Sequence, residues 1–315
     1  MKTESRTRTA MVFPGMGPSS FADVGKFMLI NPHARKLVAV ADDVLGYSLV
    51  DKFRDTEGDY SEYAQVAFLV NCLALAEWAE KTLDVVSEIV AGPSFGEKAA
   101  TAYSGSLPVE DVILLTAQLA RYLDDYFAVE HTDIVTHSFV RVGEERLADI
   151  KGELTDLDEW HEISCYVDDD FYMLTLREHN LEWLKKRLRA IGGLSLYTMR
   201  PPMHCGIFEP LRTKVAEELF TNLEFADPRI PVVKDQDGSE ITTGAGVREM
   251  LLDGFVRPTR WTDIVATLKA RGIERVCVAG ADSLFSRVGL TRKNFDVLAV
   301  NPRMAMQPRR RAAVA

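Results

Sequence analysis

The stretch Val90–Ala100 reads VAGPSFGEKAA, and it joins an apolar run to residues that favour a helix. Ser94 lies between Gly92 and Gly96, so the backbone can turn there more tightly than larger side chains would allow. A strand, a sharp turn and a helix in this order are typical of a nucleophile elbow. Such a turn leaves the hydroxyl at a helix N-terminus, where backbone N–H groups favour negative charge. Taken alone, the GxSxG pattern also surrounds many serines that have no catalytic function.

Strands and helices alternate on both sides of this stretch. Apolar runs predict strands at TAMVFPG, VVSEIVAG, IPVVKD and RVCVAG. Helical periodicity predicts helices over residues 34–44, 65–83, 97–104, 109–127, 209–223, 245–252, 261–271 and 284–289. Apolar residues cover so much of the helix at 65–83 that we expect it to be central. The alternation predicts an α/β fold with a parallel sheet.

The pattern changes between residues 128 and 198. Short strand candidates (DIVTHSFVRVG, HEISCYVD and FYMLTLR) flank helical stretches at 144–154 and 180–191, and two glycines follow the second helix. We therefore expect a small α+β insert with an antiparallel sheet. The predicted domains are a catalytic domain over residues 1–127 and 199–315 and a small subdomain over residues 128–198.

Composition limits the class of protein. The 315 residues include 47% apolar and 27% charged residues and carry a net charge of −10, which argues against a nucleic-acid binder. Four cysteines without a CxxC pair suggest neither disulfides nor a metal site. The sequence has no apolar run long enough for a membrane span and no signal-peptide segment, so we expect a cytoplasmic protein. The basic tail PRRRAAVA is expected to be solvated.

Two further motifs accompany the serine. FPGMG lies at residues 13–17, and PPMHCGIF places His204 110 residues after Ser94. In this order the three motifs resemble the malonyl-CoA:acyl-carrier-protein transacylase family, whose motifs read FPGQG, GHSxGE and a histidine in an HC or FHS context. The resemblance runs from about residue 11 to residue 300. It implies a hydrolase-like core with a parallel sheet and a ferredoxin-like insert between the serine and the histidine.

The resemblance also implies the roles of individual residues. Ser94 would be the nucleophile, and His204 would be the base that takes its proton. The backbone N–H groups of Met16 and Phe95 would form the oxyanion hole. In GFVRPTRW, the Gly254 carbonyl would orient the histidine. No bound cofactor or metal is expected, because the acyl group arrives on the phosphopantetheine of a carrier protein or on CoA.

The position of the family's substrate-binding arginine differs in this chain. Members that transfer malonyl hold its carboxylate with an arginine on the helix after the elbow, and the corresponding position here is Leu119. Arg121 lies about 200° further around that helix and cannot substitute without a shift of register. A carboxylate facing a leucine would lose its partner, so malonyl is disfavoured. Pro93 also replaces the histidine that usually precedes the serine, which removes one hydrogen bond.

A second difference lies in the insert, where YVDDDF contains Asp168, Asp169 and Asp170. These carboxylates would favour a cationic acyl group if they lie near the acyl channel. The alternative is a solvated turn between two strands. Met203, next to the histidine, is also a candidate for substrate contact.

These observations predict an acyltransferase that moves a non-malonyl acyl group, aminoacyl or dipeptidyl, between two acyl carrier proteins in polyketide antibiotic biosynthesis. The alternatives are an editing hydrolase that releases the acyl group to water, a malonyl or acyl-CoA transacylase, and a scaffold that binds carriers without chemistry. We expect a monomer. Carrier proteins are acidic, so basic residues are candidates for docking unless they are only solvated. These candidates are Lys185, Lys186, Arg189, Arg287 and Arg292.

Overall fold

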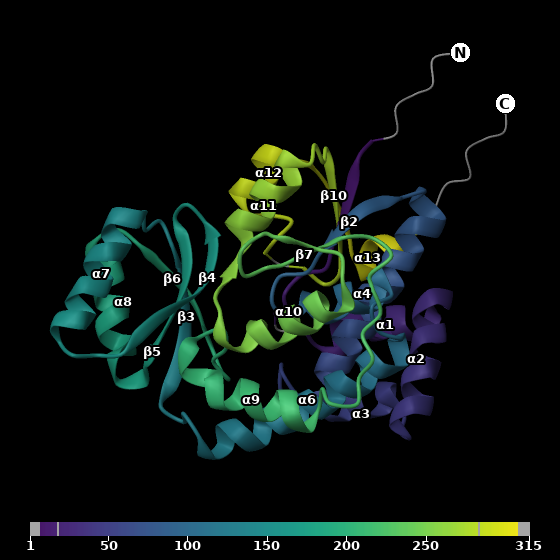
Figure 1. Ribbon diagram of the computed structural model, residues 1–315, viewed down its shortest axis with the longest axis horizontal. Coiled ribbons are helices and arrows are strands. Elements are labelled where there is room, and N and C mark those ends of the chain that lie inside the picture. The colour runs from purple at the N-terminus through teal and green to yellow at the C-terminus, as the bar shows by residue number, and fades with distance from the viewer. Residues whose placement is uncertain (1–6, 18, 283, 308–315) are drawn as a thin grey trace, which may run out of the picture.

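Two β-sheets organise the fold, and helices pack against both (Figure 1). A computed structural model of the protein describes residues 7–17, 19–282 and 284–307. The basic tail at residues 308–315 lies outside the described residues. The predicted α/β class is confirmed, with a parallel core sheet and a smaller antiparallel sheet.

The larger sheet has six strands among the described residues, in the order β11-β10-β1-β2-β7-β8. All neighbouring pairs with a recorded register are parallel except β7 and β8, which are antiparallel. Its strands are β1 (Thr9–Val12), β2 (Ser87–Ala91), β7 (Val232–Val233), β8 (Glu240–Ile241), β10 (Arg275–Ala279) and β11 (Asp296–Val300).

Successive residues of these strands point to opposite faces, as the period of a strand requires. On β1, Met11 packs in the cluster that contains α4 (Glu62–Leu83), whereas Ala10 packs in the cluster that contains α11 (Trp261–Ala270). Every residue of α4 from Ala64 to Ala76 is buried, which confirms the prediction of a central helix. Both faces of the parallel sheet are therefore covered.

The smaller sheet has the order β6-β3-β5-β4-β9. Its antiparallel strands are β3 (Ile134–Val140), β4 (His161–Asp168), β5 (Phe171–Arg177) and β6 (Leu194–Met199). The fifth strand, β9 (Thr259–Arg260), comes from the large domain and pairs with β4 in parallel. A strand from one domain thus continues the sheet of the other.

Helices α7 (Glu144–Asp156) and α8 (Leu181–Ala190) cover the outer face of the small sheet (Figure 1). Val135 and Phe139 on β3 pack against them. Thr136, next to Val135, and Ser138, next to Phe139, point to the opposite face and line a cavity. The small sheet therefore separates α8 from that cavity.

The remaining helices surround the large sheet or connect its strands. They are α1 (Phe21–Ile30), α2 (Pro32–Leu45), α3 (Leu49–Asp55), α5 (Gly96–Ser104), α6 (Val109–Val129), α9 (Glu209–Glu218), α10 (Gly244–Val256), α12 (Gly289–Asn294) and α13 (Pro302–Ala305), with 3₁₀ turns η1 (Glu178–Asn180) and η2 (Gly206–Phe208). No helix in the described ranges is long and apolar enough to cross a membrane. All four cysteines are buried and unpaired.

One predicted helix is wrong. Residues 284–288 form a turn, and α12 begins only at Gly289. The Asp282 carboxylate accepts hydrogen bonds from the backbone N–H groups of Leu284, Phe285 and Ser286, and these bonds fix the turn. Strand β11 and strand β6 were not predicted.

Candidate active site

Ser94 occupies a strained turn between β2 and α5. Its φ angle is +55°, a left-handed conformation that side chains other than glycine seldom adopt. The flanking glycines are required because the chain closes on itself here. A Cβ atom at Gly92 would lie 2.1 Å from the Gly96 carbonyl oxygen, and one at Gly96 would lie 2.1 Å from the Phe13 carbonyl oxygen. The segment therefore has the geometry of a nucleophile elbow.

His204 meets this serine from 110 residues further along the chain. Ser94 Oγ and His204 Nε2 lie 2.8 Å apart, within hydrogen-bond distance. His204 also has a left-handed backbone, with φ of +66°, and its N–H donates to the Phe255 carbonyl over 3.0 Å. The end of α10 thus fixes the histidine over the serine.

The surroundings of His204 keep the imidazole neutral. Burial lowers its pKa below the ordinary value, while the Asp235 carboxylate and the Gly254 backbone act in the opposite direction and Lys98 adds to the lowering. Only the neutral form can accept the serine proton, so the shift favours general-base chemistry. His204 Nδ1 is buried and has no partner in hydrogen-bond geometry among the described residues. The Gly254 backbone lies near enough to raise the pKa of the ring, but it does not meet the geometry of a hydrogen bond with Nδ1.

The two expected oxyanion-hole residues lie beside the serine. Met16 and Phe95 line the same cavity as Ser94 and His204. Among the described residues, the structure gives neither of their backbone N–H groups a hydrogen-bond acceptor. The Phe95 N–H lies at the start of α5 and the Met16 N–H in the loop after β1, and unpaired N–H groups are suited to a negatively charged oxygen.

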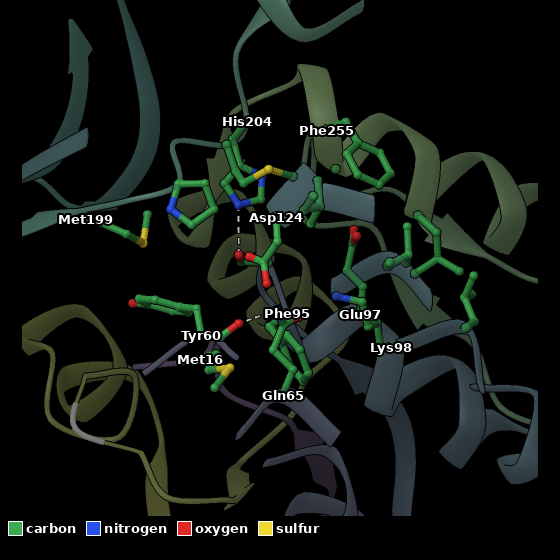
Figure 2. A pocket seen from close by; sticks show the side chains of 18 of the residues that line it. Met16, Tyr60, Gln65, Phe95, Glu97, Lys98, Asp124, Met199, His204 and Phe255 are labelled. Carbon is green, nitrogen blue, oxygen red and sulfur yellow. Dashed lines mark hydrogen bonds between the residues drawn. The ribbon is translucent and has the colours of Figure 1, made fainter. Parts of the chain in front are cut away.

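Two cavities meet at Ser94 and His204. The narrow cavity has a volume of about 130 Å³ and runs between α6 and α10 (Figure 2). The wide cavity has a volume of about 520 Å³ and lies against the inner face of the small sheet. Five residues line both cavities, and they are Met16, Tyr60, Ser94, Met199 and His204.

The narrow cavity contains the position of the expected arginine. Leu119 lines it and is 3% exposed, and Met203 lines it as well. Arg121 does not line it: its Nη1 lies 2.7 Å from Glu62 Oε1 and its side chain is 52% exposed. No guanidinium thus reaches the floor of this cavity among the described residues.

Two charged side chains that the sequence analysis did not select also line the narrow cavity. Lys98 reaches into it beside Glu97 (Figure 2), and its Nζ lies 4.1 Å from the centroid of the Phe95 ring. Burial lowers the pKa of Lys98 to about 8, against the effect of Glu97. Asp124 lines the same cavity, and neither it nor Lys98 has an ion-pair partner among the described residues.

The expectation that Asp168 and Asp170 lie near the acyl channel is wrong. Neither residue lines the narrow or the wide cavity. Asp168 Oδ2 instead accepts a hydrogen bond from the Leu290 backbone N–H over 3.0 Å, and Asp170 is exposed in the turn between β4 and β5. The alternative interpretation, a solvated turn between two strands, fits Asp169 and Asp170, whereas Asp168 is the last residue of β4.

The candidate docking residues fall into two groups. Lys185, Lys186 and Arg189 belong to α8, which the small sheet separates from the wide cavity. Arg287 follows the wall residues Leu284 and Phe285 of that cavity, and Arg292 lies on α12. Only the second group lies on segments next to the cavity.

A buried acidic pair adjoins the serine and histidine. Asp235 is fully buried and its Oδ2 lies 2.6 Å from the Ser94 backbone nitrogen. Glu97, the residue after Gly96, is 4% exposed. Glu97 could have been selected from its place in the serine motif, whereas no local pattern marks Asp235. Among the described residues no group of three side chains could hold a metal ion.

Known proteins resemble the chain over nearly its whole length. The malonyl CoA-acyl carrier protein transacylase of Salmonella typhimurium is 24% identical over 302 residues, covering 94% of this chain and 95% of the relative. The enzyme of the same name from Bacillus subtilis is 22% identical over 295 residues, covering 91% and 90%. In addition, the family described as the VinK acyltransferase small domain matches residues 138–199.

Solved structures share the fold. A malonyl transacylase in complex with its type II polyketide synthase acyl carrier protein has a TM-score of 0.83, with 22% identity and coverage of 95% of this chain and 97% of that one. The acyltransferase domain from the second module of the salinomycin polyketide synthase has a TM-score of 0.76, with 20% identity and coverage of 92% and 66%. Together with the serine and histidine geometry, these similarities identify an enzyme of the acyltransferase class to which the carrier-protein transacylases belong.

Proposed function

We propose that this acyltransferase takes a short non-malonyl acyl unit from one acyl carrier protein and passes it to a second carrier protein in polyketide-type biosynthesis. The observation that carries the proposal is the 2.8 Å contact between Ser94 Oγ and His204 Nε2 where two cavities of unequal size meet. The names of the compared proteins support carrier proteins as partners and polyketide synthesis as the setting.

The acyl group is transferred in two half-reactions. His204 Nε2 takes the Ser94 proton as Oγ attacks the thioester carbonyl, and the resulting oxyanion faces the backbone N–H groups of Met16 and Phe95. The C–S bond then breaks, His204 gives its proton to the departing sulfur, and an ester is left on Ser94. In the second half-reaction the acceptor thiol gives its proton to His204 and attacks the ester carbonyl. The bond between Ser94 Oγ and the carbonyl carbon then breaks, and His204 gives the proton to Ser94 Oγ.

The unequal cavities suggest separate tasks. A cavity of about 130 Å³ is comparable to the roughly 150 Å³ that encloses a benzene ring, so the narrow cavity suits an acyl unit of about six non-hydrogen atoms. An aminoacyl unit has this size, whereas a dipeptidyl unit is larger. The wide cavity, at about 520 Å³, is suited to the flexible phosphopantetheine arm.

The lining of the narrow cavity favours a polar, non-anionic acyl unit. Leu119 offers no partner to a terminal carboxylate. Asp124 offers an acceptor to an amine or amide N–H group, and the Lys98 ammonium offers donors to an acyl oxygen. An aminoacyl group supplies the nitrogen donor for Asp124, but its one carbonyl oxygen faces the oxyanion hole, so Lys98 would pair with a further oxygen of the acyl unit.

A malonyl-type transacylase is the second candidate, and Lys98 is the observation in its favour. This ammonium lines the narrow cavity without an ion-pair partner among the described residues. It would attract a malonyl carboxylate if that group lay within reach, because a buried charge gains most from a paired charge. The two candidates differ in what the substitution Lys98→Met would do to malonyl transfer.

Intact-protein mass spectrometry tests the proposal. The enzyme is incubated with carrier proteins loaded with acetyl, malonyl, alanyl or alanyl-alanyl thioesters, with Ser94→Ala as the control. We expect an alanyl adduct on the wild type, little malonyl adduct, and none on the variant. A dominant malonyl adduct that disappears in Lys98→Met would establish the second candidate instead.

The acceptor half-reaction needs its own assay. Purified acyl-enzyme is mixed with an unloaded carrier protein, and loss of the adduct is followed against gain of acylated carrier. Transfer requires that the acceptor accelerates loss of the adduct and receives the acyl group. Release that is unaffected by the acceptor would identify an editing hydrolase.

A further inference from the structure

Two carboxyl groups are buried together beside the Ser94 and His204 pair, although the reaction just described uses neither. Glu97 lies in the first turn of α5, and Asp235 follows β7. They are 4% and 0% exposed. Because a buried charge is costly unless it is compensated, their partners decide which of them is ionised.

Asp235 is bound to the backbone of the serine itself. Its Oδ2 accepts hydrogen bonds from the Ser94 N–H over 2.6 Å and from Thr259 Oγ1 over 3.0 Å. Ser94 has a strained φ of +55°, so the first of these bonds holds the residue in the conformation that exposes its hydroxyl. A carboxylate accepts such bonds better than a neutral carboxyl group does.

The two carboxyl groups are close enough for a side-chain hydrogen bond between Glu97 and Asp235, and the oxygen of Asp235 left for that bond is Oδ1. Asp235 Oδ1 is buried and has no N–H or neutral O–H donor among the described residues. Glu97 Oε1 accepts a hydrogen bond from Gln236 Nε2 over 2.9 Å, and a Cβ atom at Gly254 would lie 2.8 Å from Glu97 Oε2. The one proton that can satisfy Asp235 Oδ1 is therefore a proton on Glu97. Two buried carboxyl groups in contact retain one proton between them, as in other acid pairs.

The charges around the pair agree with this assignment. Burial and the negative charge of Asp235 both raise the pKa of Glu97 well above its usual value. The groups that face the pair and His204 are few: Lys98 on α5, Cys165 on β4, and the imidazole itself. The Cys165 thiol has a pKa raised by burial and stays neutral. Burial also raises the pKa of Asp235, but the hydrogen bond from Glu97, the charge of His204 and the bonds from Ser94 and Thr259 all act in the opposite direction. Because Asp235 has these donors, we take it as the anion of the cluster that faces His204.

We propose, resting on the proposed function, that Asp235 is a positioning residue whose carboxylate, hydrogen-bonded by protonated Glu97, fixes the Ser94 backbone and stabilises the imidazolium that forms on His204. No hydrogen bond joins Asp235 to the His204 ring among the described residues. The carboxylate acts through the field in a buried site, where a charge is poorly screened. It supplies the stabilisation that the acid of a Ser-His-Asp triad provides through direct contact.

The pH dependence of Ser94 reactivity tests this proposal. The rate of labelling by a small fluorophosphonate probe is measured from pH 4 to pH 9 in the wild type and in Asp235→Asn, Glu97→Gln and the double variant. His204 must be neutral to act as base, and removing a nearby anion lowers its pKa. We therefore expect the acid limb of the profile to move to lower pH in Asp235→Asn and at least as far in the double variant.

The plateau rate gives a second readout. We expect it to fall about ten-fold or more in the double variant, because the imidazolium loses its counter-charge. In Glu97→Gln the amide still donates to Asp235, so the acid limb should keep its wild-type position. Asp237→Asn is the matched control, since Asp237 lies two residues further on and pairs with Arg257 at the surface. Unchanged acid limbs in both Asp235→Asn and the double variant would overturn the proposal.

A measurement on the wild type does not depend on whether the variants fold. Infrared spectroscopy at pH 7 should detect the band of a protonated carboxyl group, and the absence of this band would overturn the shared-proton assignment. The probe needs no acyl carrier. Failure of every carrier thioester to load Ser94 would therefore count against the proposed function. The pH profile of probe labelling tests only the role of Asp235.

Discussion

The narrow cavity and the wide cavity meet at the same serine, but different parts of the chain build them. Helices α5, α6 and α10 of the large domain supply most of the narrow cavity, with apolar side chains such as Leu115, Leu119 and Leu251. Strands β3 to β6 supply much of the wide cavity, with hydroxyl side chains such as Thr136 and larger ones such as Phe171 and Tyr197. Under the proposed function, the acyl unit is therefore recognised by the large domain, and the small sheet contributes to recognition of the carrier arm.

This separation explains how specificity can change without loss of catalysis. Ser94 and His204 are held by the elbow and by the end of α10. A substitution at the floor of the narrow cavity leaves those backbone contacts in place. The four predictions below examine whether the cavities are as independent as the structure indicates.

The largest effect is expected at the atom that both cavities share. Ser94→Ala removes the hydroxyl that carries the acyl group, so no adduct should form with any acyl unit. His204→Ala should lower the rate of adduct formation by about 10²–10⁴-fold, because it removes the general base. Mass spectrometry of the adduct measures both. Persistent acylation of Ser94→Ala would show that another side chain reacts.

Carrier binding provides the control for this pair of variants. Ser94→Ala removes one oxygen from the wall of the wide cavity and leaves the rest of its lining in place, so the affinity for a loaded carrier protein should change by less than about two-fold. A large loss of affinity would mean that the serine itself contributes to binding of the arm.

A switch of acyl preference is the second prediction. Leu119→Arg introduces a guanidinium into the narrow cavity, where a bidentate pair with a malonyl carboxylate contributes about 1.5–3 kcal/mol, or roughly 10–100-fold in loading relative to alanyl. Competition between malonyl and alanyl carriers measures the ratio. Leu119→Met, which keeps an apolar side chain of similar volume, is the control.

Both variants at this position need a stability check, because Leu119 is 3% exposed. Thermal unfolding identifies a variant that has lost its fold rather than its preference. A folded Leu119→Arg enzyme with unchanged preference would mean that the acyl tail does not reach α6. The tail would then have to occupy the wide cavity, and the comparison drawn above would fail.

The sequence predicted the elements that bear strong local patterns. The central helix α4 follows from its apolar coverage, and strands β3, β4 and β5 follow from their alternation. Strand β11 escaped prediction because it is an edge strand with half-exposed residues, which weakens the apolar pattern. An element that forms through contacts with distant parts of the chain cannot be predicted from its own residues alone.

The residues of the candidate site also differ in whether a local sequence pattern marks them. The serine and histidine could be found because both lie in motifs with a family resemblance. Asp235 could not, since its partner Ser94 is 141 residues earlier in the chain. The opposite error occurred at Asp168, whose run of acidic neighbours suggested a ligand site although its carboxylate binds the backbone of Leu290.

The third prediction concerns the wide cavity and its mouth. Arg287→Glu should raise the KM for a carrier protein by about three-fold to ten-fold at low salt, and less at high salt, because exposed charges near an interface act mainly on encounter. Lys186→Glu on α8 is the matched charge reversal. It should change KM by less than about two-fold, since the small sheet separates α8 from the cavity. Equal effects of the two variants would place the carrier elsewhere.

The smallest effect is expected at Asp124, the carboxylate that lines the narrow cavity. Burial raises the pKa of this group, with a contribution from its neighbour Asp125, but more than a third of the residue is exposed to solvent. An ion pair in such a place contributes about 1 kcal/mol or less, which corresponds to at most about five-fold in loading. Asp124→Asn should therefore lower alanyl loading by a few-fold and leave acetyl loading unchanged, with Asp125→Asn as the neighbouring control. Equal losses for alanyl and acetyl would mean that Asp124 shapes the mouth of the cavity rather than binding an amine. The preference for an aminoacyl unit would then rest on the size of the cavity alone.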